Sequence, residues 1–196
     1  MTNIYVLNKF EENPYPHAVE VDTTSKGGFK DLSPFYLGPV TDPFYGDVAL
    51  NFENYWQYSK IYHDDYDPLV GPTPAYWSWR AAGFANPRAV RYPKGKGAKP
   101  LGLLHGNEIF DYIPSRRKVY APIYAELVRA TKSYNMLFNW SYNEGRDLVL
   151  RDFDGYDYHR FGISLIDVIN DPRRKMGHAF ILAGMLTGHL NQMLEE

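Results

Sequence analysis

The chain has 196 residues, a formal net charge of −2 and no cysteine. These values exclude disulfides, thiolate zinc sites and thiol nucleophiles, and they give no overall attraction to nucleic acid, although a local basic patch could supply one. The length suits one domain, predicted to span residues 1–196, and aromatic residues make up 16% of the chain. The start lacks a secretory signal pattern and no run reaches the roughly 18 apolar residues of a membrane span, so we expect a cytoplasmic protein without membrane contact.

The first 50 residues predict short strands joined by loops. The β-prone pieces IYVLNKF (4–10) and AVEVD (18–22) alternate with turn formers. The segment DLSPFYLGPV (31–40) is expected to be extended, because Pro34 and Pro39 restrict the residues before them.

The stretch NFENYWQYSKIYHD (51–64) is the first predicted helix, with Asn51 as its N-cap. Glu53, Gln57 and Lys60 follow at steps of four and three, which places them on one stripe of a helix, within about 40°. Two interpretations of this stripe stay open: the solvated face of a surface helix, or the polar wall of a cavity enclosed by the surrounding aromatic residues. Enclosure would raise the carboxyl pKa of Glu53, which could then exchange protons near neutrality.

Residues 75–84 predict a short helix, and residues 86–102 predict a basic loop rich in glycine and proline. Four cations stand among glycines in its segment RYPKGKGAKP, so backbone N–H groups could approach a phosphate there: Arg91, Lys94, Lys96 and Lys99. A solvated, mobile loop is the alternative. A Walker loop is excluded because the spacing Gly-x4-Gly-Lys-Ser/Thr is absent.

The rest of the chain predicts two long helices and a strand. SRRKVYAPIYAELVRATKSYNMLF (115–138) is expected to be the longest helix, with Pro122 in its first turn. DLVLRDFDGYDYHRFG (147–162) predicts a short strand that enters an acidic, aromatic turn. The last helix is expected to follow Asp171 as N-cap, with Pro172 at its first position. These elements predict an α+β, helix-dominated fold with short N-terminal strands.

The turn RDFDGYDYHR (151–160) gathers four polar side chains around Gly155: Asp152, Asp154, Asp157 and His159. A calcium loop would require an acid where Ile163 stands, and the six histidines include no pair at zinc-binding His-x3-His or His-Glu-x2-His spacing. A turn held by local hydrogen bonds, a site carboxylate and a metal ligand are the three interpretations that remain.

Several of these pieces form an ordered set: LSPFYLGPV, ENYWQYSKIY, ANPRAVR, the helical segment RRKVYAPIYAELVRATKSYNMLF with its Asp-containing turn, and RRKMGHAFILAGML. The set resembles the NADAR superfamily (NAD- and ADP-ribose-associated proteins), where an LSNFYPSPF-like segment precedes an EHYFQAQKF-like helix. The resemblance spans about residues 31–187. Asn54 stands where the family usually has His, GYDY replaces its WGIG-like turn, and Lys175 occupies the approximate place of its closing Asn.

The resemblance implies an N-glycosidase that hydrolyses the bond between ribose C1′ and a base nitrogen in an ADP-ribosyl or ribosyl-phosphate conjugate, such as ADP-ribosylated guanine. Such a bond breaks through an oxocarbenium-like state that a carboxylate stabilises, and we assign that role to Glu53. Asp154 or Lys60 would be the donor to the departing base. No metal or redox cofactor is required.

The expected partner is a nucleotide or an ADP-ribose-containing substrate, including one carried on nucleic acid. The residues expected to bind it are cations for phosphates, aromatic rings for stacking and one amide: Arg91, Lys96, Arg116, Phe35, Trp56, Tyr156 and Gln57. Two alternatives stay open, a non-catalytic protein that binds or sequesters ADP-ribose or a nucleotide, and a structural or protein-binding domain.

Overall fold

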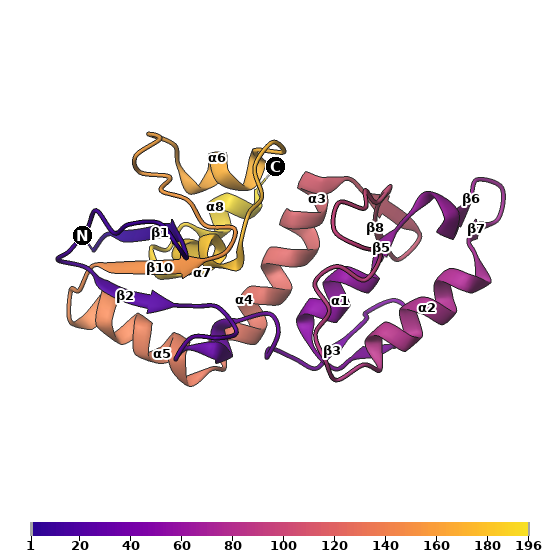
Figure 1. Cartoon of the computed structure of the whole chain (residues 1–196), viewed down its shortest axis with the longest axis horizontal. Coiled ribbons are helices and arrows are strands. Elements are labelled where there is room, and N and C mark those ends of the chain that lie inside the picture. The colour runs from indigo at the N-terminus through magenta and orange to yellow at the C-terminus, as the bar shows by residue number, and fades with distance from the viewer. Residues whose placement is uncertain (1, 196) are drawn as a thin grey trace. The chain divides into compact units, whose positions relative to one another are not determined.

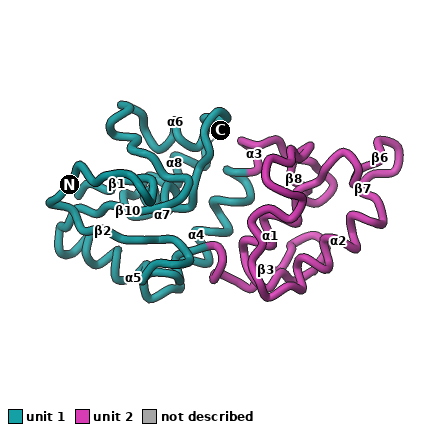
Figure 2. The backbone as a smooth tube through the Cα atoms, in the orientation of Figure 1, with its two compact units in different colours: residues 1–33, 116–196 teal, residues 34–115 magenta. Residues whose placement is uncertain are grey.

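The computed structural model describes residues 2–195, and its helices and small sheets confirm the expected α+β class. The chain forms two compact units, coloured separately in Figure 2. Unit 1 comprises residues 1–33 and 116–196, and unit 2 comprises residues 34–115. The sequence predicted one domain over residues 1–196 and gave no sign of a division into two compact units. None of the described helices combines the length and hydropathy that crossing a membrane requires.

Unit 1 contains a three-stranded parallel sheet. Strand β10 (Leu148–Asp152) lies between β1 (Ile4–Asn8) and β2 (Val19–Asp22), as Figure 1 shows. Every residue of β10 is buried, as is typical of a central parallel strand. The structure therefore confirms the strands predicted in these three parts of the sequence.

The helical elements of unit 1 are short and are joined by turns. They are the 3-10 turn Lys30–Leu32, the π-helical turns Arg116–Tyr120 and Asn139–Asn143, α4 (Ala121–Arg129), α5 (Lys132–Phe138), α6 (Leu165–Asn170), α7 (His178–Leu186) and α8 (Leu190–Leu194). Helix α7 is apolar along almost its whole length and packs against β1, β10 and α4. A helix that is hydrophobic on all sides belongs in a core, and here it forms the centre of unit 1.

The long helix predicted over residues 115–138 is interrupted. Pro122 does lie in the first turn of α4, but α4 ends at Arg129. The side-chain oxygen of Thr131 then accepts a hydrogen bond from the Tyr134 N–H and begins α5 as a new N-cap. The sequence contained this capping signal, which the apolar periodicity obscured.

The prediction of one final helix that follows Asp171 is wrong. Asp171 is the C-cap of α6, and α7 begins only at His178, after Gly177. The Asp171 carboxylate accepts hydrogen bonds from the backbone and side chain of Arg173, so it holds a turn instead of capping a helix. Gly188, with a positive φ of 75°, then separates α7 from α8.

Unit 2 is built from three α-helices, a three-stranded sheet and several smaller elements. They are β3 (Val40–Thr41), β4 (Val48–Ala49), α1 (Phe52–Tyr58), β5 (Lys60–Ile61), the 3-10 turn His63–Asp65, β6 (Tyr66–Asp67), β7 (Gly71–Pro72), α2 (Pro74–Phe84), β8 (Gly102–His105), β9 (Glu108–Phe110) and α3 (Tyr112–Ser115). Strand β8 pairs with both β5 and β9 in antiparallel fashion. The segment 31–40, expected to be extended, begins inside the 3-10 turn of unit 1 and pairs as a strand only from Val40.

Both helices predicted in unit 2 are present. Asn51 is the N-cap of α1, because its side-chain oxygen accepts a hydrogen bond from the Asn54 N–H at 2.9 Å. Helix α1 ends at Tyr58, so Lys60 lies in strand β5. The prediction that Lys60 belongs to the same helix as Glu53 and Gln57 is therefore wrong. The basic segment before β8 forms no regular element, as predicted.

A buried arginine anchors the β3–β4 hairpin to α2. The Arg80 guanidinium donates to the carboxylates of Asp42, at 2.6 Å, and Asp47, and it lies 4.2 Å from the centre of the Phe84 ring. Arg80 is 1% exposed, and a charge buried this deeply requires such partners. The sequence analysis had no expectation for this group, whose members are far apart in the chain.

Candidate functional site

The residues expected to form the site belong to both units. Unit 2 holds the acid, amide and lysine of the predicted stripe, two cations of the basic loop and two aromatic residues: Glu53, Gln57, Lys60, Arg91, Lys96, Phe35 and Trp56. Unit 1 holds Asp154, Tyr156 and Arg116.

Glu53, Gln57 and Lys60 form a continuous line of hydrogen bonds. The Gln57 Nε2 donates to Glu53 Oε1 at 2.9 Å, and the Lys60 Nζ donates to Gln57 Oε1 at 2.7 Å. Glu53 is 7% exposed and Gln57 is 8% exposed. The interpretation as a solvated helix face is therefore wrong for these two residues, and the three side chains meet even though Lys60 comes from a strand.

The chemistry of the Gln57 amide fixes the direction of this line. A carboxylate only accepts hydrogen bonds and an ammonium only donates them. The amide therefore presents its NH2 to Glu53 and its oxygen to Lys60, since the flipped amide would place two acceptors together. The amide thus joins a negative group to a positive one through oriented dipoles.

Lys60 also lines a pocket of about 240 Å³ in unit 2. Its walls are mostly apolar or aromatic, and its lining residues are Trp56, Lys60, Pro100, Leu101, Gly102, Leu103, Phe110, Asp111, Tyr112 and Ser115. The Lys60 Nζ lies 5.4 Å from the centre of the Trp56 ring, within the range of a cation–π interaction. The line that starts at buried Glu53 therefore reaches this pocket at Lys60.

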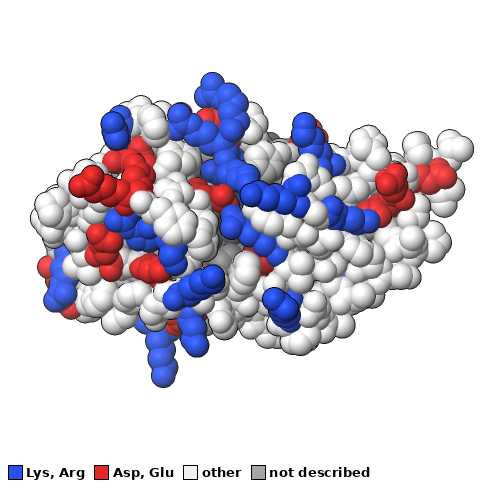
Figure 3. Space-filling view, in the orientation of Figure 1, with Lys and Arg blue, Asp and Glu red and all other residues white. Residues whose placement is uncertain are grey.

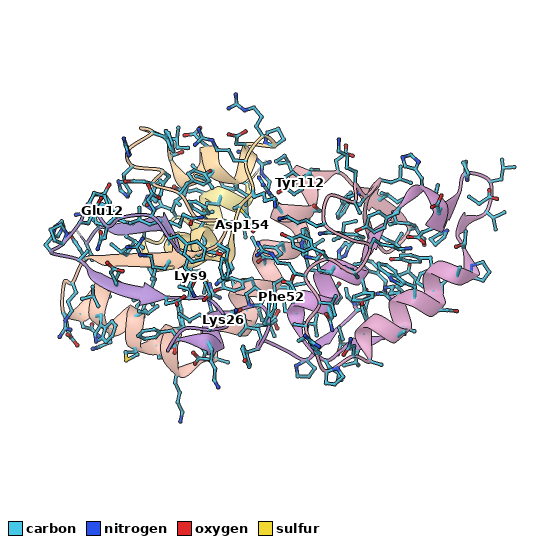
Figure 4. All side chains as sticks on the ribbon, viewed as in Figure 1. Lys9, Glu12, Lys26, Phe52, Tyr112 and Asp154 are labelled. Carbon is cyan, nitrogen blue, oxygen red and sulfur yellow. The ribbon has the colours of Figure 1, made fainter. Side chains whose placement is uncertain are left out.

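The sequence analysis missed the pocket wall formed by the β8–β9 hairpin and α3. Figure 4 labels Tyr112, the first residue of α3. A usable signal existed, because Gly106 and Asn107 stand between two apolar runs, and Gly-Asn is typical of a two-residue hairpin turn. That signal predicts the β8–β9 hairpin, but it does not predict that the hairpin and α1 line the same pocket.

The segment with Phe35 is attached to the start of α1. The Phe52 N–H donates to the Leu37 carbonyl at 2.8 Å, and the Glu53 N–H donates to the Pro34 carbonyl at 3.0 Å. These bonds satisfy two of the N–H groups that a helix leaves unpaired at its first turn. Phe35 is partly buried. The two motifs LSPFYLGPV and ENYWQYSKIY are therefore joined directly through backbone hydrogen bonds.

The start of the basic loop is held by Asn54. Its side-chain nitrogen donates to the carbonyl oxygens of Asn86 and Arg88, at 2.9 and 3.0 Å, and its oxygen accepts from the Val90 N–H at 2.8 Å. Asn54 is fully buried. Asn54 therefore has a clear structural role in holding residues 86–90, which precede the glycine-rich basic segment 91–100.

Further along the loop, one lysine is bound to the protein and another faces water. The Lys94 Nζ pairs with Asp65 at 2.9 Å and lies 4.7 Å from the centre of the Trp79 ring. Lys96 is exposed, and Gly95 and Gly97 beside it have positive φ angles. In the view of Figure 3, lysine and arginine side chains are spread over the visible surface and are not confined to one patch.

In unit 1 the predicted site residues are Asp154 and Tyr156, in the turn after β10, and Arg116, just before α4. The Asp154 N–H donates to Asp152 Oδ1 at 3.3 Å, and Tyr156 packs on the Phe180 ring with centroids 4.7 Å apart. Burial raises the pKa of the Tyr156 hydroxyl. Arg116 is 2% exposed and donates to the backbone carbonyls of Ile169, in the last turn of α6, and of Asp171 and Arg174, in the segment that follows. These bonds give Arg116 a structural role in that segment.

Unit 1 also contains a buried Asp–His pair that the sequence analysis did not foresee. The His178 Nδ1 lies 3.1 Å from Asp152 Oδ2, and its Nε2 lies 3.0 Å from the Thr23 carbonyl. Both ring nitrogens of His178 therefore face oxygen atoms that can accept hydrogen bonds. Asp152 also accepts from the Ala179 N–H in the first turn of α7. A Cβ at Gly177 would overlap the Asp152 carboxylate, so this position requires glycine.

Within residues 2–195, no group of three or more His, Asp and Glu residues is arranged to hold a metal ion. The metal interpretation of the turn at residues 151–160 therefore has no geometric support there.

No family model, no curated protein and no solved structure matches this chain. The resemblance to the NADAR superfamily accordingly stays a prediction from the motifs.

Proposed function

We propose that the chain is a NADAR-like N-glycosidase that hydrolyses the bond between ribose C1′ and a base nitrogen in an ADP-ribosyl or ribosyl-phosphate conjugate. The observation that carries this proposal is the buried Glu53, joined through Gln57 to a lysine in the wall of a pocket. A solvated surface stripe would offer none of these features.

Glu53 would act on the sugar. As the C1′–N bond breaks, its electron pair stays with the base and positive charge develops on C1′ and the ring oxygen. A carboxylate stabilises this charge most strongly where water is excluded, and Glu53 is 7% exposed. Water then adds its hydroxyl to C1′ and its remaining proton goes to the base, so the products are a sugar hemiacetal and a free base.

Lys60 would act on the departing base. Its ammonium lines the pocket and can donate a hydrogen bond to the nitrogen or oxygen that gains electron density. Gln57 keeps this ammonium next to the pocket by accepting a hydrogen bond from it. In the proposed complex Trp56 stacks on the base, while Arg91 and Lys96 contact phosphates of the substrate or of a nucleic acid that carries it.

A non-catalytic ADP-ribose-binding protein is the second candidate. It is favoured by Asn54, because the position that is usually His in the NADAR family is here occupied by a residue that holds the basic loop. In this case the polar line would bind a ribose without cleaving its bond.

Product analysis in 18O-labelled water distinguishes the two candidates. The full chain is incubated separately with NAD, an oligonucleotide carrying ADP-ribosylated guanine, and a ribosylamino-pyrimidine phosphate, and the mixtures are separated by chromatography. An N-glycosidase releases a free base and a sugar with 18O at C1′. A binding protein returns each compound unchanged. If all three compounds bind measurably and are recovered intact, the proposed N-glycosidase activity is refuted.

A further inference from the structure

The pocket in unit 2 is small and aromatic. Its volume of about 240 Å³ lies below the roughly 300–1,000 Å³ of pockets for drug-sized ligands. It therefore suits one ring system and not a whole nucleotide. Trp56, Phe110 and Tyr112 all contribute to its lining, and flat aromatic walls favour a planar ligand.

Two groups of opposite charge line the same pocket. Lys60 offers only hydrogen-bond donors, and the carboxylate of Asp111 offers only acceptors. Ser115 donates its hydroxyl proton to the Tyr112 carbonyl at 2.8 Å, so that proton is already used. A ligand that satisfies both charges must present an acceptor to Lys60 and N–H donors to Asp111.

We propose that the pocket binds a single planar heteroaromatic ring whose edge carries N–H donors beside a carbonyl oxygen, and that Asp111 determines this specificity. An ionised carboxylate can accept two parallel N–H bonds, which gives both strength and geometric selection. The identification of this ring as the departing base rests on the proposed function. The binding itself requires no turnover.

Ligand-observed NMR titration of the full chain tests this with two small probes. Isocytosine carries a ring N–H and an amino group beside its carbonyl, and its 2-dimethylamino analogue lacks the amino protons. Asp111→Asn is expected to weaken isocytosine binding about tenfold or more, since the amide that replaces the carboxylate cannot accept both N–H bonds of a bidentate pair. The same substitution is expected to change the affinity of the analogue by less than about twofold, because the analogue cannot form the bidentate pair.

Two control variants locate the effect. Asp64→Asn changes another exposed aspartate of unit 2 that does not line the pocket, and it should leave both affinities unchanged. Trp56→Phe should weaken both probes while keeping an aromatic wall. The proposal is overturned if neither probe binds at millimolar concentration, or if Asp111→Asn affects both probes equally.

The outcome is separable from that of the proposed function. Glu53→Gln should keep the affinity for isocytosine, because Glu53 does not line the pocket. A chain that binds isocytosine through Asp111 but hydrolyses no conjugate would support the specificity of the pocket and refute the N-glycosidase. A chain that hydrolyses conjugates with no dependence on Asp111 would support the N-glycosidase and refute the proposed specificity of the pocket.

Discussion

Each unit contains a buried carboxylate with hydrogen-bonded partners, and the two differ in where those partners lead. Asp152 of unit 1, 4% exposed, bonds His178 and the first turn of α7, so its partners belong to the protein core. Glu53 of unit 2, 7% exposed, is connected through Gln57 to a lysine that lines a pocket. Burial and pairing alone therefore do not identify a functional acid. The connection to a pocket is the property that separates Glu53 from Asp152.

The largest expected effect on folding comes from Asp152→Asn. Both oxygens of the Asp152 carboxylate accept hydrogen bonds from backbone N–H groups, so the NH2 of Asn would face a donor in either orientation, and a buried polar group left unsatisfied costs about 1–3 kcal/mol. Chemical denaturation of Asp152→Asn and Glu53→Gln measures the contrast directly. Glu53→Gln should lower the free energy of unfolding by less than about 1 kcal/mol, since the amide oxygen still accepts from Gln57. Equal losses would remove the distinction between the two acids.

The next largest effect should come from breaking the line at Gln57. Gln57→Leu removes a pre-oriented donor to Glu53 and the acceptor of Lys60, and turnover should fall about 100-fold, as for other single donors that stabilise developing charge. Gln57→Glu is the matched polar variant. It places a second carboxylate beside Glu53, which raises the carboxyl pKa of the pair, so the acid limb of the pH–rate profile should move to higher pH. An unchanged profile would show that Gln57 is not coupled to the reacting acid.

A smaller effect is expected from the exposed cation of the basic loop. Lys96→Gln should weaken binding of a phosphate-containing substrate about fivefold at low salt, and the difference should shrink as salt screens the charge. Lys132→Gln, at an exposed lysine of unit 1, is the control and should have no effect. Isothermal titration at two salt concentrations makes this measurement. A loss that persists at high salt would argue against a simple phosphate contact.

The smallest expected effect concerns the pH dependence of folding. Burial lowers the pKa of the His105 imidazole below its usual 6.5, so the folded chain holds this ring neutral while the unfolded chain can protonate it. The unfolded state then binds more protons in this range, and the stability contribution is present above pH 6.5 and is lost as the pH falls below it. His105→Gln should show a smaller loss of stability than the natural chain between pH 7 and pH 5.5, measured by denaturation at each pH. An identical loss would exclude His105 as the source.

Local signals were sufficient for much of the fold. Asn51 before an aromatic run predicted the start of α1, and the apolar residues of β10 predicted a strand, because both depend on neighbours in the chain. The failure at Asp171 has a tertiary cause. An Asp-Pro pair can begin either a helix or a turn, and here Arg116 from a distant segment binds the carbonyls of Asp171 and Arg174.

The candidate site was predictable only in part. Glu53 and Gln57 are one helical turn apart, so their contact follows from helix geometry. The end of α1 at Tyr58 was not anticipated, yet Lys60 still reaches Gln57 because the chain turns directly into β5. The β8–β9 hairpin that completes the pocket lies far along the chain, and no periodicity in α1 indicates which element faces it.

The most direct test of the account is the single-turnover hydrolysis rate of Glu53→Gln, measured beside its affinity for ADP-ribose. The substitution keeps the size and polarity of the side chain but removes the negative charge. The account predicts a rate at least about 1,000-fold lower with an affinity changed by less than about threefold, because the charge acts mainly in the transition state. A variant that hydrolyses the substrate as fast as the natural chain would contradict the assignment of Glu53 as the catalytic carboxylate.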